Sequence, residues 1–224
     1  MLYPIPLTLF VVGICLFIVF YVVSRFLYFQ RHETKYHFYN MFPYEFNYPS
    51  VFKNNLYGNL LLIIACLAIM AFYQFGSISE VYSFVTIILS ILQTMVIILL
   101  VLMPLKYLRT HIVLSVLSMV LSMAIPAFNL LIALDEIKIA PNETVKMVSI
   151  ISMVIAGLLA LSMMALILNP RMTFKIYADK ETDENGNEVL KRPKVIMVAL
   201  SEWWAIFVYF LSPLPILLLL FFII

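Results

Sequence analysis

Residues 81–105 read VYSFVTIILSILQTMVIILLVLMPL and contain no Asp, Glu, Lys or Arg. A helix of this length, rising about 1.5 Å per residue, crosses a hydrocarbon core about 30 Å thick. Five further stretches of 22 to 26 residues are equally free of these charges: 1–24, 54–79, 110–134, 147–170 and 203–224. All 26 charged residues lie between these stretches or at their edges. The sequence therefore predicts an all-α polytopic membrane protein, with one six-helix transmembrane domain over residues 1–224.

The composition agrees with this prediction. Hydrophobic residues make up 64% of the chain and charged residues only 12%, whereas globular domains are about 45–50% apolar and about 25% charged. The lipid bilayer is therefore the expected surrounding of most of the chain. The net charge of +2 is too small and too dispersed for nucleic acid binding. Cys15 and Cys66 lie inside apolar stretches, so no disulfide framework is expected.

The orientation in the membrane follows from the Lys and Arg residues. With the N-terminus outside, only Lys138 and Lys146 lie in outer loops, and the other 12 of the 14 face the inside. The positive-inside rule favours this topology, with both termini extracytoplasmic. A secretory signal peptide has basic residues before its apolar stretch, whereas here they follow the first stretch. The first stretch is therefore expected to stay in the mature protein as a transmembrane helix. The compact loops favour a cell membrane, specifically a bacterial cytoplasmic membrane.

The limits of the helices follow from the apolar stretches and the prolines. Helices are expected at about 5–28, 56–75, 82–106, 109–134 and 145–169, and from residue 203 to the end. The short connections at 76–80 and 106–109 make the second, third and fourth helices antiparallel neighbours. Pro213 and Pro215 should kink the outer half of the last helix.

The segment 30–55 is predicted to be a cytoplasmic loop that is unusually aromatic. Its rings are too costly to leave in water, and the most prominent are Tyr36, Phe38, Phe42, Tyr44 and Phe46. Two interpretations remain open. The rings either cap the helix bundle in the headgroup zone, or they form a surface for a membrane-protein partner.

The segment 171–202 is predicted to be a cytoplasmic loop with a small β-hairpin. Residues 172–177 alternate between apolar and polar side chains, and residues 189–197 offer a return strand. Asn185-Gly186 between them is a strong hairpin turn signal. The run from Glu181 resembles the start of a calcium-binding loop, but Arg192 stands where a bidentate glutamate is needed.

Polar side chains form a seam within the spans. On the fourth helix, five polar side chains fall within about 60° of one another when each residue turns the helix by 100°. They are His111, Ser115, Ser118, Ser122 and Asn129. The third helix carries a similar line, formed by Thr86, Ser90 and Gln93. Antiparallel packing predicts Gln93 beside Ser118 or Ser122. The seam either ties the helices together by hydrogen bonds or lines a pathway for a substrate.

No signature of catalysis, of a cofactor or of a metal site stands out. His111 is the only Asp, Glu, His, Lys or Arg inside the six charge-free stretches, which argues against ion-coupled transport and against an intramembrane enzyme. No glycine-rich run could hold phosphate. The leading hypothesis is a non-enzymatic accessory subunit or scaffold of a membrane complex that binds its partner through 30–55. The alternatives are a small permease for a neutral or amphiphilic substrate and, less favoured, an enzyme at the inner rim.

Overall fold

A computed structural model of the chain describes residues 4–33, 35–38, 41–47, 54–76, 78, 80–103, 107–168, 180–182, 188–190 and 196–223. Within these residues, six helical segments are long and apolar enough to cross a membrane. They correspond one to one with the six charge-free stretches, so the predicted set of six helices of membrane-spanning length and apolarity is confirmed. The predicted hairpin turn at Asn185-Gly186 and the alternating segment 172–177 lie outside the described residues.

The elements follow in chain order. They are α1 (Pro4–His32), the 3-10 helix η1 (Pro43–Asn47), α3 (Leu56–Phe75), α4 (Glu80–Leu102), α5 (Leu108–Ile139), α6 (Glu143–Ile167), β1 (Lys180–Thr182), β2 (Glu188–Leu190), α7 (Ile196–Leu211) and α8 (Leu214–Ile223). α1 and α5 run further than expected, because a helix can continue past the hydrocarbon into the charged interface. The last span begins at Ile196 instead of residue 203, so part of the segment expected to be a loop is helical.

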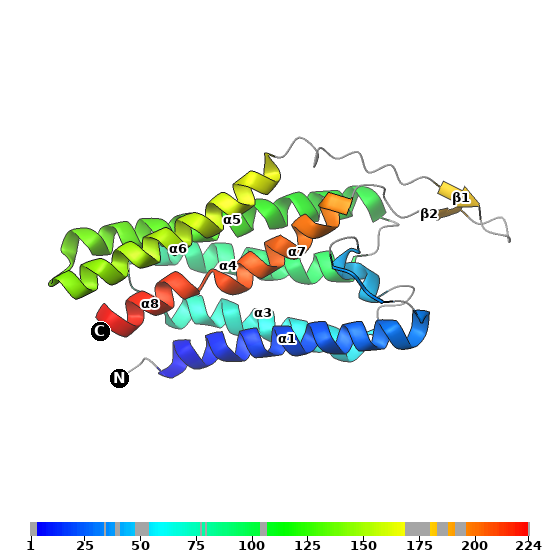
Figure 1. Cartoon of the computed structure of the whole chain (residues 1–224), viewed down its shortest axis with the longest axis horizontal. Coiled ribbons are helices and arrows are strands. Elements are labelled where there is room, and N and C mark those ends of the chain that lie inside the picture. Colours follow the sequence, from blue (N-terminus) through cyan, green and yellow to red (C-terminus); the bar gives the residue numbers. More distant parts are fainter. Residues whose placement is uncertain are drawn as a thin grey trace.

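The helices pack side by side with their axes nearly parallel (Figure 1). α1 packs on α3, α3 on α4, α4 on α5, and α5 on α6, so the antiparallel neighbours that the short connections predicted are adjacent. Gly13 allows α1 to approach α3, because a Cβ there would lie 2.7 Å from Ile69 Cδ1. Both termini lie at one end of the bundle, here called the terminus end. The described residues 35–38 and 41–47 lie at the opposite end, here called the loop end.

The last span occupies the centre of the bundle. In an 18-residue stretch of this span 67% of the residues are buried, against 17% for α6 and 22% for α1. α7 packs on α5 and η1, whereas α8 packs on α6 and α5, so the last span contacts both halves of the chain. The polar residues of α7 and α8 are therefore shielded from lipid by other helices.

The last span breaks at Ser212 and Pro213, between α7 and α8, where the prolines predicted a kink. Pro213 has no N–H to donate to the carbonyl of Tyr209 four residues earlier. The Ser212 hydroxyl donates to that carbonyl instead, at 2.7 Å. The Ser212 hydroxyl thus supplies the hydrogen bond that Pro213 cannot make.

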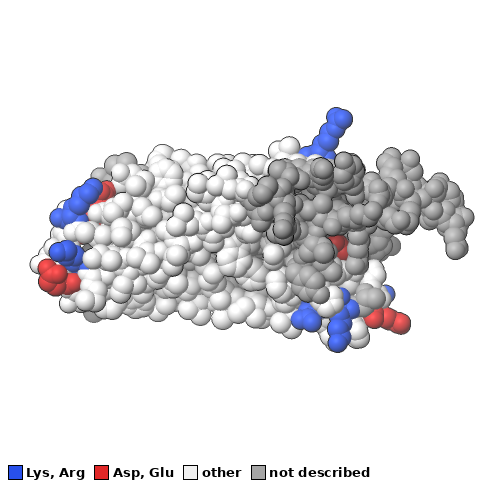
Figure 2. Space-filling model, turned by 45° about the horizontal axis from the view of Figure 1, so that its top comes forward, with Lys and Arg blue, Asp and Glu red and all other residues white. Residues whose placement is uncertain are grey.

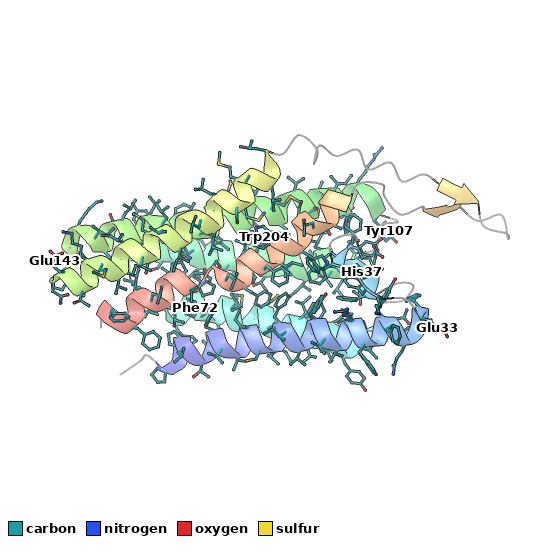
Figure 3. All side chains as sticks on the ribbon, viewed as in Figure 1. Glu33, His37, Phe72, Tyr107, Glu143 and Trp204 are labelled. Carbon is teal, nitrogen blue, oxygen red and sulfur yellow. The ribbon has the colours of Figure 1, made fainter. Side chains whose placement is uncertain are left out.

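Charged side chains gather at the two ends of the molecule, and the surface between them is uncharged in Figure 2. Figure 3 shows the same ends through the labelled Glu33 and Tyr107 on one side and Glu143 on the other. This distribution is the one that a bilayer requires, because charged side chains are costly in hydrocarbon.

β1 and β2 pair antiparallel, with Glu181 opposite Val189. The pairing covers three residues of each strand. The return strand expected at 189–197 is wrong in its extent, because Ile196 and Met197 belong to α7. The predicted hairpin itself stays a prediction, because its turn lies outside the described residues.

Candidate functional site

Gln93 joins α4 to α5 in the middle of the bundle. Its Nε2 donates to Ser122 Oγ at 2.7 Å and to Ser118 Oγ and the Ser118 carbonyl at 3.2 Å. All three residues are fully buried. The structure thus places Gln93 beside the two neighbours that the helical spacing predicted, and most of the amide's donor capacity is used within the protein.

α7 forms a third wall of the seam, which the sequence did not reveal. Ser122 Oγ donates to the Ala205 carbonyl at 2.7 Å. Thr94 Oγ1 and Tyr209 Oη lie 2.6 Å apart and share a hydrogen bond. The seam is therefore the meeting line of three helices, not of two.

The two other predicted seam residues of α4 bond to their own helix. Thr86 Oγ1 donates to the Ser83 carbonyl at 2.9 Å, and Ser90 Oγ donates to the Ile87 carbonyl at 2.8 Å. Both side chains are buried. Their hydroxyls thus add polar atoms to the face without tying it to α5.

Asn129 closes the seam toward the terminus end. Its Nδ2 donates to the Ser212 carbonyl at 2.6 Å and to Tyr73 Oη at 3.2 Å. Tyr73 Oη and Ser212 Oγ lie 2.7 Å apart. α3, α5 and the last span therefore meet in one hydrogen-bonded group.

His111 and Glu202 form a buried pair at the loop end. His111 Nε2 lies 3.1 Å from Glu202 Oε1, and His111 Nδ1 lies 3.2 Å from the Met103 carbonyl. The His111 side chain is 2% exposed and the Glu202 side chain 0%. Glu202 precedes the last charge-free stretch by one residue, so sequence reasoning assigned it to the membrane edge. Its burial inside the bundle corrects the inference that His111 alone is ionisable within the spans.

The aromatic loop covers this pair. The rings of Phe42 and Tyr44 lie edge-on to His111, with centroids 5.9 and 5.3 Å away. Of the five aromatic residues proposed as a partner surface, four are buried within the chain: Tyr36, Phe42, Tyr44 and Phe46. Phe38 is 43% exposed. The loop therefore packs mainly on its own bundle, and Phe38 is the ring it presents outward.

Tyr36 and Trp203 fasten the loop to α7. Trp203 Nε1 donates to Tyr36 Oη at 3.0 Å and to the Met41 carbonyl at 3.0 Å. Tyr36 Oη in turn donates to the Phe42 carbonyl at 2.8 Å. Burial, followed by the negative charge of Glu45, raises the pKa of Tyr36 well above its usual value. The hydroxyl thus stays protonated and can donate and accept at once.

Several buried oxygens of the seam have no hydrogen-bond partner among the described residues. They are Glu202 Oε2, Ser115 Oγ, Gln93 Oε1 and Asn129 Oδ1. Such groups are rare in proteins, and ordered water is their usual partner.

A lateral pocket of about 670 Å³ lies between α6 and α7 toward the loop end, beside the labelled Trp204 in Figure 3. It is lined by Phe38, Ser162, Ala165, Leu166, Leu200, Trp203, Trp204 and Phe207. Its polar groups are already engaged, because Trp204 Nε1 donates to Ser162 Oγ at 3.0 Å. The pocket therefore offers mainly hydrocarbon and aromatic surface to a ligand, and its volume lies in the range of small-molecule sites.

One signal in the sequence would have revealed the polar face of the last span. Glu202, Ala205, Tyr209 and Ser212 are spaced by three, four and three residues, which places them on one side of a helix. The pocket had no comparable signal, because its lining comes from three segments that are distant in the sequence.

Comparison with known proteins adds no relative. No protein-family model, curated protein or solved structure matches the chain.

Proposed function

We propose that the protein is a non-enzymatic membrane protein that binds the hydrocarbon chain of an amphiphile in the pocket between α6 and α7. The observation that carries this proposal is the pocket itself. Its described lining residues carry no acid, amine, imidazole or thiol. The hydroxyl of Ser162 donates to the Leu159 carbonyl and accepts from Trp204 Nε1, so no base in the lining activates it as a nucleophile.

The position of the pocket favours a lipid-like ligand. Ala165 and Leu166 lie at the end of α6, and Trp203 and Trp204 lie at the middle of α7, in the first half of the last span. The site therefore opens near one face of the membrane, where a hydrocarbon chain enters sideways while its polar head stays at the interface. Phe38 of the loop contributes to the rim.

Intrinsic fluorescence tests this proposal directly, because the chain contains only two tryptophans and both line the pocket. A bromine-labelled fatty acid titrated into vesicles containing the protein should quench this fluorescence with saturation. Ala165→Phe fills the pocket and should leave only the weak quenching of random collisions. Met164→Phe, at an exposed neighbouring residue that does not line the pocket, serves as the matched control. Equal quenching of Ala165→Phe and wild type would refute the proposal.

An accessory role in a membrane complex is the second candidate. Phe38 favours it, because this ring is exposed beside the pocket while the other four proposed partner residues of the 30–55 loop are buried. In this case Phe38→Ala should release a co-purifying membrane protein, whereas the inserted amount should stay unchanged. If Phe38→Ala retains every partner, the loop is a cap and this candidate fails.

The proposed orientation of the bundle in the membrane follows from the distribution of charged residues. With the positive-inside rule, the loop end faces the cytoplasm of a bacterial cell and carries the 171–202 segment with its hairpin, and both termini lie outside. The pocket then opens to the cytoplasmic leaflet.

A further inference from the structure

Aromatic rings make up half of the lining of the pocket between α6 and α7. Four of its eight lining residues are aromatic: Phe38, Trp203, Trp204 and Phe207. The three on α7 lie on one side of that helix, because they are spaced by one and three residues. Trp203 is completely buried, whereas Trp204 and Phe207 are half-buried and Phe38 is 43% exposed. A ligand in the pocket therefore meets the rings of Phe38, Trp204 and Phe207.

The side chains of the lining have no hydrogen-bond donor left for an anion. Both indole N–H groups are engaged by the contacts described above, and the Ser162 hydroxyl donates to the Leu159 carbonyl at 2.7 Å. The lining residues of α6 and α7 lie within helices, where backbone N–H groups bond along the helix. A carboxylate or phosphate leaves water readily only where donors replace that water. The pocket therefore disfavours an anionic head.

The end of α6 favours positive charge beside the pocket. Ala165 and Leu166 line the pocket from the last turn of α6. The carbonyl groups in the last turn of a helix carry a partial negative charge. This turn of α6 contains no basic side chain that would offset the charge. A cation at this end of the pocket is therefore stabilised, and an anion is repelled.

A quaternary ammonium group fits this lining better than a primary one. A primary ammonium group has three N–H donors that need acceptors. The nearby acceptors are already used, because the Met164 carbonyl accepts from the Leu168 N–H at 2.9 Å and Ser162 Oγ accepts from Trp204 Nε1. A quaternary ammonium group has no N–H, and it is attracted to the face of an aromatic ring within about 6 Å of the ring centroid.

We propose that the pocket selects amphiphiles whose head is a quaternary ammonium group without a phosphate. This inference rests on the proposed function and names its class of ligand. The hydrocarbon chain occupies the pocket, and the methyl groups of the head lie at the rim, between Phe38 and the end of α6. Cation–π attraction and the negative helix end hold the head, and binding changes no covalent bond.

Displacement of a bromine-labelled fatty acid tests this selectivity. The full chain is reconstituted into phosphatidylethanolamine–phosphatidylglycerol vesicles, which contain no choline, and the fatty acid quenches the tryptophans. Dodecyltrimethylammonium, dodecylammonium and dodecanoate are then added separately at about pH 7, where a primary amine is protonated. The two cations have the same chain and the same charge, so the vesicle surface attracts them equally. Dodecyltrimethylammonium should restore half of the fluorescence at a concentration at least about fivefold lower than dodecylammonium, and dodecanoate should be the weakest competitor.

Variants of Phe38 show whether the ring provides the selectivity. Phe38→Leu removes the ring at an exposed position, and it should raise the half-displacement concentration of dodecyltrimethylammonium at least about threefold while that of dodecanoate stays unchanged. Phe38→Tyr keeps a ring and should behave like wild type. Phe26→Leu is the matched control, because Phe26 is exposed on α1 and does not line the pocket.

The outcomes separate this inference from the proposed function. Saturable quenching with equal displacement by all three amphiphiles overturns the head selectivity and leaves amphiphile binding intact. The same holds if Phe38→Leu keeps the full preference for dodecyltrimethylammonium. If dodecylphosphocholine displaces the fatty acid as readily as dodecyltrimethylammonium, the site accepts a choline phospholipid head and the restriction to heads without phosphate is wrong. Quenching of the wild type that does not saturate refutes the proposed function and this inference together.

Discussion

Replacing Gln93 by leucine tests whether the seam holds the bundle together. The change removes the donor of three contacts, to two oxygens of Ser118 and to Ser122 Oγ. Hydrogen bonds between membrane helices average about 0.6 kcal/mol and reach about 1.7 kcal/mol. Ser122 keeps its bond to the Ala205 carbonyl, and the unpartnered Gln93 Oε1 is removed together with the amide. We therefore expect a net loss of about 1 kcal/mol in the free energy of unfolding.

The assay is reversible unfolding in mixed micelles, followed by tryptophan fluorescence. A loss of about 1 kcal/mol corresponds to about 2–4 °C in Tm for a chain of this size. Gln74→Leu is the matched control, because Gln74 lies on α3 with its side chain exposed and should leave stability unchanged. An equal Tm for Gln93→Leu and wild type would refute the packing role. A loss above about 4 kcal/mol would show that the amide does more than join α4 to α5.

Three further predictions follow from the two ends of the bundle. In a Cys15→Ser background, Glu143→Cys should react with an impermeant thiol reagent added to intact cells and Tyr107→Cys should not, and the reverse pattern would invert the proposed orientation. Phe42→Ala should cost about 3–5 kcal/mol of stability because its ring is 2% exposed, whereas Phe38→Ala should cost little; equal losses in denaturant titrations would contradict the observed docking of the loop. The pKa of Tyr36 is raised in the folded protein. The protonated Tyr36 hydroxyl should therefore contribute fully to stability below about pH 10, and this contribution should decline as the pH rises above that value. Tyr36→Phe should remove this alkaline decline.

The sequence predicted the six spans well because the bilayer imposes a simple rule on charge. The same rule explains the main error of the prediction from sequence, which placed Glu202 at the membrane edge. Glu202 adjoins the charge-free stretch 203–224, so it was counted with the edge residues, yet its pairing with His111 allows it to be fully buried. Pro213 marked the break correctly, because a missing N–H acts locally.

The loop and the pocket depend on contacts that local patterns do not encode. Tyr36 is fixed by Trp203, which lies 167 residues away in the sequence. The aromatic composition of the loop was consistent with a cap and with a partner surface alike. The third wall of the seam was overlooked for a different reason. Tyr209 alone does not indicate which side of an apolar helix faces inward, and the signal lies in its helical spacing from Glu202 and Ser212.

Photochemical crosslinking with a diazirine-labelled fatty acid in native-like vesicles tests amphiphile binding most directly. Adducts located by mass spectrometry should concentrate on residues 162–166 of α6 and 200–207 of α7, and excess unlabelled fatty acid should displace them. Adducts spread over the exposed faces of α1 and α6 in proportion to their exposure, without competition, would contradict the account.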